Sequence, residues 1–256
     1  MKQFHGAMIA TLALTGLVAC NNDSNGGGPA ELPAPTAVTT GTGDLAAVTT
    51  TLTAFKTSLG GANNNATPGT QPTGFRAVNW DAVADTLTQK DNFAAQTFSN
   101  RGLFMQTPGT GFRVDTAGYV AIPNIAAGQF PPFSGKKLFA SIGSPLMDAL
   151  FNVPGNLSKP ATVSAFGVIF VDNEVAGSAS IEPFDAEGRS LGVFPAPVTG
   201  AGQFSFVGVT FDSAIVARVR IKSGTAALGT AAEAAGGATD LVVMDDFVYG
   251  EPLGTN

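Results

Sequence analysis

Residues 163–171 read Val-Ser-Ala-Phe-Gly-Val-Ile-Phe-Val, a short run that is apolar at nearly every position. A strand with one solvated face alternates apolar and polar residues, whereas a strand covered on both faces is apolar throughout. We therefore expect residues 163–171 to form a central strand. Residues 215–222 alternate instead, which predicts a strand with one solvated face. Its expected core positions are Ile215, Ala217, Val219 and Ile221, and its expected outward positions are Arg218, Arg220 and Lys222.

Short apolar runs of this kind recur about every ten residues through the C-terminal third of the chain. The chain has 32 glycines and 16 prolines, and only 12% of its residues are charged. Such a composition disfavours a helical bundle and suits short strands joined by tight turns. We therefore predict an all-β fold, an antiparallel, jelly-roll-like β-sandwich over residues 75–256. The clearest strands are expected at 163–171, 178–184, 190–194, 203–211, 215–222 and 240–249.

The first 20 residues have the parts of a bacterial export signal. Lys2 is followed by an apolar run from Ala7 to Val18, which is shorter than the roughly 20 residues that a membrane-spanning helix needs. Leu17-Val18-Ala19-Cys20 resembles the lipobox of bacterial lipoproteins. The resemblance implies that residues 1–19 are removed and that Cys20 is lipidated, palmitate being a typical acyl group. Asn21 favours export to the outer membrane. The alternative is an ordinary signal peptide with a chance cysteine.

Cleavage before Cys20 would also limit the chemistry of the mature protein. It removes His5, the sole histidine, and lipidation occupies Cys20, the sole cysteine. Histidine-dependent nucleophilic catalysis, Cys/His zinc sites and disulfides are then excluded. The chemistry that remains is cation binding by oxygen ligands, sugar recognition and hydrolysis by paired carboxylates.

The charge pattern argues against a nucleic-acid partner. The net charge is −6, and the longest basic run is the pair Lys136-Lys137. Nucleic-acid binding requires a basic footprint.

The segment before the sandwich divides into two parts. Residues 20–43 are rich in Asn, Gly, Pro and Thr, which predicts a flexible tether from the lipidated cysteine. Residues 44–74 are expected to form a short helix and a loop. The helix is predicted to begin after Asp44 as N-cap and to end at Gly60-Gly61, because Leu45, Val48, Leu52 and Phe55 fall at helical spacing.

Two elements resemble a secreted bacterial family of unassigned function. These are Asn79-Trp80-Asp81 near the start of the sandwich and the closing strand Val243-Met244-Asp245-Asp246-Phe247. Ala82 and Ala84 stand where that family has Gly and Pro. More loosely, the closing strand resembles that of jelly-roll carbohydrate-binding modules and galactose-binding-like domains, in which acidic residues often hold a structural calcium.

The pair Asp245-Asp246 is the strongest candidate for a metal site. Adjacent strand residues point to opposite faces, so one carboxylate is expected to face the core, where it needs a cation or several hydrogen-bond donors. Calcium takes six to eight oxygen ligands, and Asp172-Asn173-Glu174 at the end of a central strand offers more of them. The predicted calcium ligands are Asp81, Asp172, Asn173, Asp245 and Asp246.

Alternatives remain open for these residues. Asp172-Asn173 is equally typical of a turn, and one carboxylate of Asp245-Asp246 can pair with Arg218 or Arg220. Trp80 is either a sugar-stacking residue or part of the core.

We therefore predict a non-catalytic, lipid-anchored envelope protein that binds a glycan or another cell-surface ligand. The first alternative is a structural or adhesive subunit of the cell envelope. The second is a glycoside hydrolase that uses Glu182 with Asp172 or Asp185.

Overall fold

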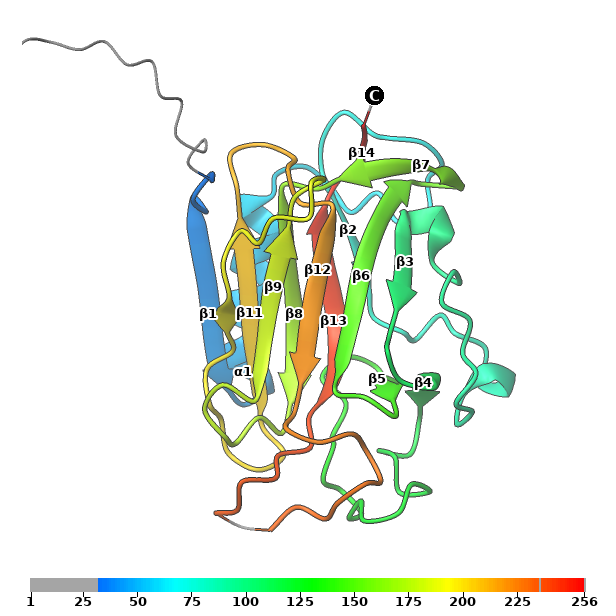
Figure 1. The fold of residues 1–256 in the computed structure, drawn as a ribbon, viewed down its shortest axis with the longest axis vertical. Helices are drawn as coiled ribbons and strands as arrows, with labels where there is room; N and C mark the ends of the chain where they lie inside the picture. The colour runs from blue at the N-terminus through cyan, green and yellow to red at the C-terminus, as the bar shows by residue number, and fades with distance from the viewer. Residues whose placement is uncertain (1–31, 235, 256) are drawn as a thin grey trace, which may run out of the picture. The chain divides into compact units, whose positions relative to one another are not determined.

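The computed structural model describes residues 32–234 and 236–255, and Figure 1 shows two antiparallel sheets packed face to face. The prediction of an all-β sandwich with a short N-terminal helix is confirmed. Sheet A contains, in order, β1 (Ala37–Gly43), β11 (Phe204–Thr210), β8 (Ala165–Val171), β13 (Val243–Gly250), β5 (Leu138–Ile142) and β4 (Gly111–Asp115), and β2 (Phe75–Val78) also pairs with β13. Sheet B contains β10 (Phe194–Pro195), β9 (Ala179–Phe184), β12 (Arg218–Ser223), β6 (Leu146–Val153), β7 (Asn156–Thr162) and β14 (Leu253–Gly254), and β3 (Leu103–Gln106) also pairs with β6. Two short 3-10 helices, η1 (Asp85–Leu87) and η2 (Ser99–Arg101), precede β3.

Strand β8 is central and buried along its whole length, as its sequence predicts. Phe166, Val168 and Phe170 belong to the core between the two sheets. Ile169 and Val171 belong to a second core on the other face of sheet A, which helix α1 (Leu45–Ser58) helps to cover. The continuous apolar run is therefore the signature of a strand with packing on both sides.

Helix α1 packs over a hollow in sheet A. The predicted N-cap is present, because the Asp44 carboxylate accepts the Ala47 backbone N–H at 2.9 Å. Gly167 and Gly208 lie opposite each other on β8 and β11. A Cβ on Gly167 would lie 2.6 Å from the Phe206 ring, and one on Gly208 would lie 2.7 Å from the Phe55 ring. The two glycines thus leave the space that Phe55 fills.

The end of the predicted tether is a strand. Residues 37–43 form β1, which pairs with β11 over all seven positions. The threonines and Val38 of this segment are β-branched residues that fit a pleated edge strand, so the assignment of residues 37–43 to a tether is wrong. The signal sequence and Cys20 lie outside the described residues.

Strand β13 changes its partner halfway along one edge. Met244 pairs with Phe139 of β5, whereas Phe247 pairs with Val78 of β2, and the register against β8 shifts between Met244 and Phe247. Trp80, which follows β2, lies at this junction. Its ring stacks on that of Phe139 with centroids 3.8 Å apart, and its indole N–H donates to the Asp245 carbonyl at 2.9 Å.

Because Trp80 is fully buried, the hypothesis that it stacks on a sugar is wrong. A ring enclosed by Phe93, Phe98, Phe139 and Phe247 has no face free for a ligand. Its alternative role, as part of the core, is the one that the structure shows.

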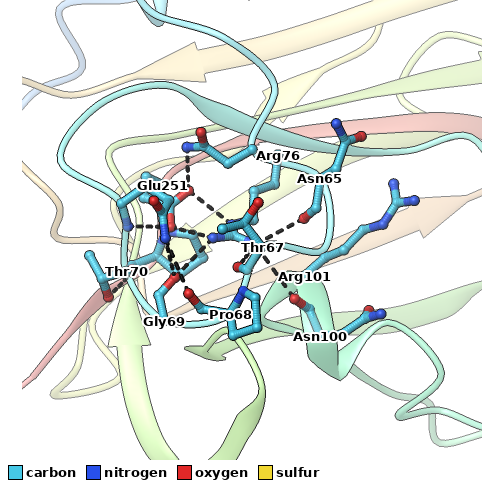
Figure 2. Close-up of polar contacts among 12 residues, drawn as sticks. Asn65, Thr67, Pro68, Gly69, Thr70, Arg76, Asn100, Arg101 and Glu251 are labelled. Carbon is cyan, nitrogen blue, oxygen red and sulfur yellow. Dashed lines mark hydrogen bonds and ion pairs between the residues drawn. The ribbon is translucent and has the colours of Figure 1, made fainter.

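A buried ion pair fixes the loop before β2 (Figure 2). The Arg76 guanidinium donates to both carboxylate oxygens of Glu251, at 2.9 and 2.7 Å, and also to the backbone carbonyls of Asn65, Thr67 and Gly69. Glu251 in turn accepts the Gln71 backbone N–H at 2.9 Å. The pair therefore joins the end of β13 to a loop that has little apolar packing of its own.

We expect Glu251→Gln to destabilise the protein by about 3 kcal/mol, because removing one partner leaves Arg76 buried without its counter-charge. Urea unfolding measures this loss. Glu187→Gln is the control, since its weak pairing with Arg189 is exposed and should contribute under about 1 kcal/mol. A loss for Glu251→Gln no larger than that of the control would contradict the assigned role of the pair.

Candidate functional site

The outward face of sheet B presents its side chains in two rows across four strands. The register pairs Arg218 with Phe184 and Leu150, and Leu150 with Phe104. One step along the strands, it pairs Arg220 with Glu182 and Asp148, and Asp148 with Gln106. The first row is Phe184, Arg218, Leu150 and Phe104, and the second row is Glu182, Arg220, Asp148 and Gln106.

Three residues of the first row, Arg218, Leu150 and Phe104, line a hollow of about 580 Å³. Strand β7 pairs only with the last residues of β6, because β3 occupies the rest of that edge. In Figure 1, β7 lies across the end of β6. Leu157 and Pro160 of β7 and the turn at Asp185 to Gly188 thereby form walls of the hollow. Its lining is mainly apolar, and Asn152 and Arg218 add hydrogen-bonding groups.

The second row belongs to a neighbouring hollow of about 420 Å³. Gln106, Asp148 and Arg220 line it, together with residues 107–108 and 146–147. Since the two rows are consecutive on the same strands, the two hollows are neighbours along β6. We call them together the sheet B groove.

A shared carboxylate holds the two arginines of the groove. Asp148 accepts from Arg218 at 2.9 Å and from Arg220 at 3.0 and 3.3 Å. The guanidinium carbon of Arg218 also lies 3.8 Å from the centroid of the Phe184 ring. Both contacts restrict the side chains, so the guanidinium groups are positioned before any ligand arrives.

Asp245 and Asp246 do not point to opposite faces, contrary to the expectation from the sequence. The register shift between Met244 and Phe247 breaks the alternation, as a β-bulge does, and both side chains are buried. Asp245 accepts the backbone N–H groups of Phe133 and Ser134 at 2.8 and 3.1 Å. The Ser134 hydroxyl lies 3.2 Å from Asp245 and 2.6 Å from Asp246. These donors supply the partners that a buried carboxylate requires.

The surroundings of this pair raise the pKa of Asp245 and provide an ion-pair partner for Asp246. Burial, together with the neighbouring Asp246, raises the pKa of Asp245 well above its ordinary value. Asp246 forms an ion pair with Lys56 at 3.6 Å. It does not pair with Arg218 or Arg220, because both arginines contact Asp148 on the outer face of the other sheet.

Asp81 contacts the same segment as Asp245. Its carboxylate accepts the Lys136 backbone N–H at 2.8 Å. The Asn-Trp-Asp and Asp-Asp-Phe elements therefore meet in the fold, and their acidic residues hold residues 133–136 in place.

Asp172 and Asn173 lie elsewhere, beyond the end of β8. Asp172 is buried and accepts the Gly202 backbone N–H, and its φ of +70° is that of a turn residue. Asn173 accepts from the Ser178 hydroxyl at 2.6 Å and donates to the Pro197 carbonyl at 2.9 Å. The turn interpretation of Asp172-Asn173 therefore describes their local structure.

Among the described residues, Asp172, Glu174 and Glu233 form the group of three acidic residues close enough to share one cation, with carboxylate oxygens within 4.8 Å of one another. The five predicted calcium ligands thus fall into two groups rather than one. Calcium binding itself stays a prediction. Burial raises the pKa of Asp172, and burial with the charges of Asp172 and Asp240 raises the pKa of Glu233 to about 8.

The carboxylate pairs considered for hydrolysis are not arranged as a catalytic pair. Glu182 faces outward on sheet B, whereas Asp172 lies beyond the end of a sheet A strand. Asp185 accepts the backbone N–H groups of Glu187 and Arg189 and pairs with the Arg189 guanidinium, so it closes a turn.

Sequence reasoning assigned outward side chains to one strand of the groove, β12, and did not identify the groove itself. It placed Arg218 and Arg220 outward correctly. It placed Ala217 in the core, but Val216 is buried instead and Ala217 lines the groove. Asp148 and Asn152 alternate with buried residues on β6, so the sequence of residues 146–153 does carry the pattern that predicts their outward position. The position of β7 could not be predicted in this way, because it depends on β3 pairing with most of the same edge of β6.

Comparisons with known proteins give two structural likenesses. No protein-family model matches the chain, and no curated protein matches it. The CBM22-1 xylan-binding domain of Paenibacillus barcinonensis Xyn10C is 11% identical, with a TM-score of 0.27 over 60% of this chain and 88% of that domain. The enzymatically active domain of tailspike protein 4 from bacteriophage CBA120 is 14% identical, with a TM-score of 0.27 over 67% of this chain and 22% of that one.

Within residues 32–234 and 236–255, the structure has no helix with the length and apolar character needed to cross a membrane.

The raised pKa of Glu233 predicts how stability depends on pH. In the unfolded chain this carboxyl has a pKa of about 4.5, and in the fold about 8, so between these values the folded state holds a proton that the unfolded state has lost. Stability from this group is therefore complete below about pH 4.5 and is lost as the pH rises through 8. We expect Glu233→Gln to melt at the parent temperature at pH 4 and above it at pH 9.

Thermal melts in EDTA at both pH values make this measurement, with Glu187→Gln as a control that should follow the parent profile. An equal effect of Glu233→Gln at both pH values would contradict the assignment. The same melts repeated with calcium check the predicted ion, which should raise the melting temperature of the parent.

Proposed function

We propose that this protein is a non-catalytic, lipid-anchored protein of the bacterial cell envelope whose sheet B groove binds a glycan chain. The observation that supports it most is the groove itself, which consists of two open, neighbouring hollows and combines apolar with planar hydrogen-bonding side chains. Ligand sites typically have this mixture of a mainly apolar lining and a few fixed polar groups.

The two rows match the two kinds of surface on a sugar. A pyranose ring has apolar C–H faces and a rim of hydroxyl groups. In the first row, Phe104 and Leu150 offer apolar contact. In the second row, Gln106 and Arg220 offer hydrogen bonds. A chain of sugars lying along β6 would meet both rows at successive residues, which favours an oligosaccharide over a single small molecule.

Binding without catalysis is favoured by the state of the groove carboxylates. Asp148 already accepts three hydrogen bonds from two arginines. Asp185 accepts two backbone N–H groups of its own turn and pairs with Arg189. A glycosidase needs two carboxyl groups free to face a glycosidic bond.

Phe104→Ala should weaken glycan binding about tenfold, because a ring of this size loses its apolar contact with the sugar. Affinity electrophoresis through gels containing plant or bacterial polysaccharides measures it, after a glycan array selects the ligand. Gln106→Ala, at an exposed position, should weaken binding without affecting folding. Leu87→Ala removes an exposed apolar side chain away from the groove and should bind as the parent does.

A parent protein that binds no glycan would refute the proposal. So would binding that neither groove variant weakens, since the ligand would then lie elsewhere.

Lipid anchoring through Cys20 has its own test. When cells that express the protein are grown with radioactive palmitate, the parent protein should become labelled. Cys20→Ser should carry no label and should be absent from the membrane fraction. Several acyl chains on one residue hold a protein at a membrane far more firmly than one chain, whose association constant is about 10⁴ M⁻¹. A parent that takes up no label and is absent from the membrane fraction would instead support an ordinary signal peptide.

One observation favours the structural or adhesive alternative. Strand β1 stands at one end of sheet A, and its residues, Ala37 to Gly43, include no charge and no proline. Charged residues and prolines normally protect an edge strand from pairing with another chain, and β1 has neither. An adhesive subunit would use this edge and leave the sheet B groove without a role.

A further inference from the structure

The positively charged residues on the outward face of sheet B are concentrated on one strand, and two of them line the groove. Arg218, Arg220 and Lys222 occupy successive outward positions of β12. The acidic residues on the neighbouring strands are Asp148 of β6 and Glu182 of β9. These five side chains sum to one positive charge, in a protein whose net charge is −6. Asp185, which lines the first hollow, is paired with Arg189, so the outward face of these three strands is less acidic than the molecule as a whole.

The positively charged side chains of β12 are only partly paired with carboxylates. Asp148 is shared by both arginines, and Glu182 forms no ion pair within 4 Å among the described residues. Lys222 donates to the Gly177 carbonyl at 2.9 Å rather than to a carboxylate. Three N–H groups of the two guanidiniums donate to Asp148, and their other N–H groups have no acceptor within the described part of the chain.

The free N–H groups are positioned rather than mobile. Arg218 is held between Asp148 and the Phe184 ring, and the Arg220 guanidinium carbon lies 5.8 Å from the same ring. The Arg220 side chain keeps 45% of its surface exposed in the second hollow. A fixed, exposed guanidinium is the group that best matches a planar carboxylate, because two parallel N–H groups can donate to its two oxygens.

From these observations we propose that the groove selects acidic glycans, chains whose sugars carry carboxylate groups, and that Arg220, with Arg218 beside it, binds those carboxylates. This inference rests on the proposed glycan-binding function and names its ligand class. The remainder of the acidic surface would repel such a chain, so binding is directed to the groove. The aromatic and apolar residues of the first row would contact the sugar rings between the charged groups.

A pair of polymers with the same backbone provides the test. Polygalacturonate carries a carboxylate on each sugar, and its fully methyl-esterified form is neutral. In calorimetry or affinity electrophoresis at low salt, the parent should bind the acid form at least about tenfold more tightly than the ester. This preference should shrink as salt is added, since the Arg220 guanidinium is exposed to screening.

Variants then locate the preference. Arg220→Gln should reduce binding of the acid form to the level of the ester and leave the ester unchanged. Arg220→Lys, which keeps the charge but loses the paired N–H groups, should retain only part of the preference. Lys90→Gln removes an exposed positive charge away from the groove and should keep the parent's preference, and melting curves confirm that each variant is folded.

The outcomes separate this inference from the function on which it rests. Equal binding of acid and ester, or binding of neutral glycans alone, would overturn the acidic ligand class while leaving a glycan-binding groove. An acid preference that Arg220→Gln does not reduce would overturn the assigned residues. A protein that binds no polysaccharide of either kind, and none on the glycan array, would overturn both.

Discussion

Strand β13 has to serve two different partners along one edge, and the rest of sheet A depends on how it does so. Beyond the bulge at Asp245-Asp246, the strand pairs with β2 instead of β5. Trp80 fills the junction, and its φ of +66° is costly for a bulky residue. The stacking on Phe139 and the hydrogen bond to the Asp245 carbonyl hold it there. The same bulge directs two carboxylates at residues 133–134, so one irregularity positions a strand exchange, a core aromatic ring and a surface segment.

The parts of the fold that were predictable from sequence are those that local residues determine. Residues 163–171 have one stable environment, buried on both faces, and their composition shows it. Helix α1 carries its own start signal at Asp44. Strand β1 does not, because a threonine- and glycine-rich segment is equally typical of a loop until β11 offers seven pairing positions. Asp245 and Asp246 were misjudged for a related reason. Alternation along a strand is a local rule, whereas a bulge is set by pairing with strands distant in sequence.

The side chains of the sheet B groove depend less than the core does on the bulge in β13. Its residues occupy the outward positions of strands whose inward residues are buried, such as Val219 and Ile221 of β12. The inward residues fix the strand spacing and twist, so the outward side chains hold their relative positions without a ligand. Rigid scaffolds of this kind reduce the conformational entropy lost on binding. A binding face can therefore change its specificity through the outward residues with little effect on the core.

The arginines are of two kinds: some are buried in ion pairs that stabilise the fold, and others are partly exposed on sheet B. Arg76 is fully buried against Glu251, and Arg113 is held between Asp91 and Asp115. Each serves to fix a loop or a strand end. Arg220 differs, since it shares its carboxylate with Arg218 and remains partly exposed beside a hollow. A chain with few charged residues keeps two arginines and a lysine on one face of one strand, where they pair incompletely. Asp148 and the Phe184 ring account for part of this placement, and the proposed acidic ligand would complete the pairing.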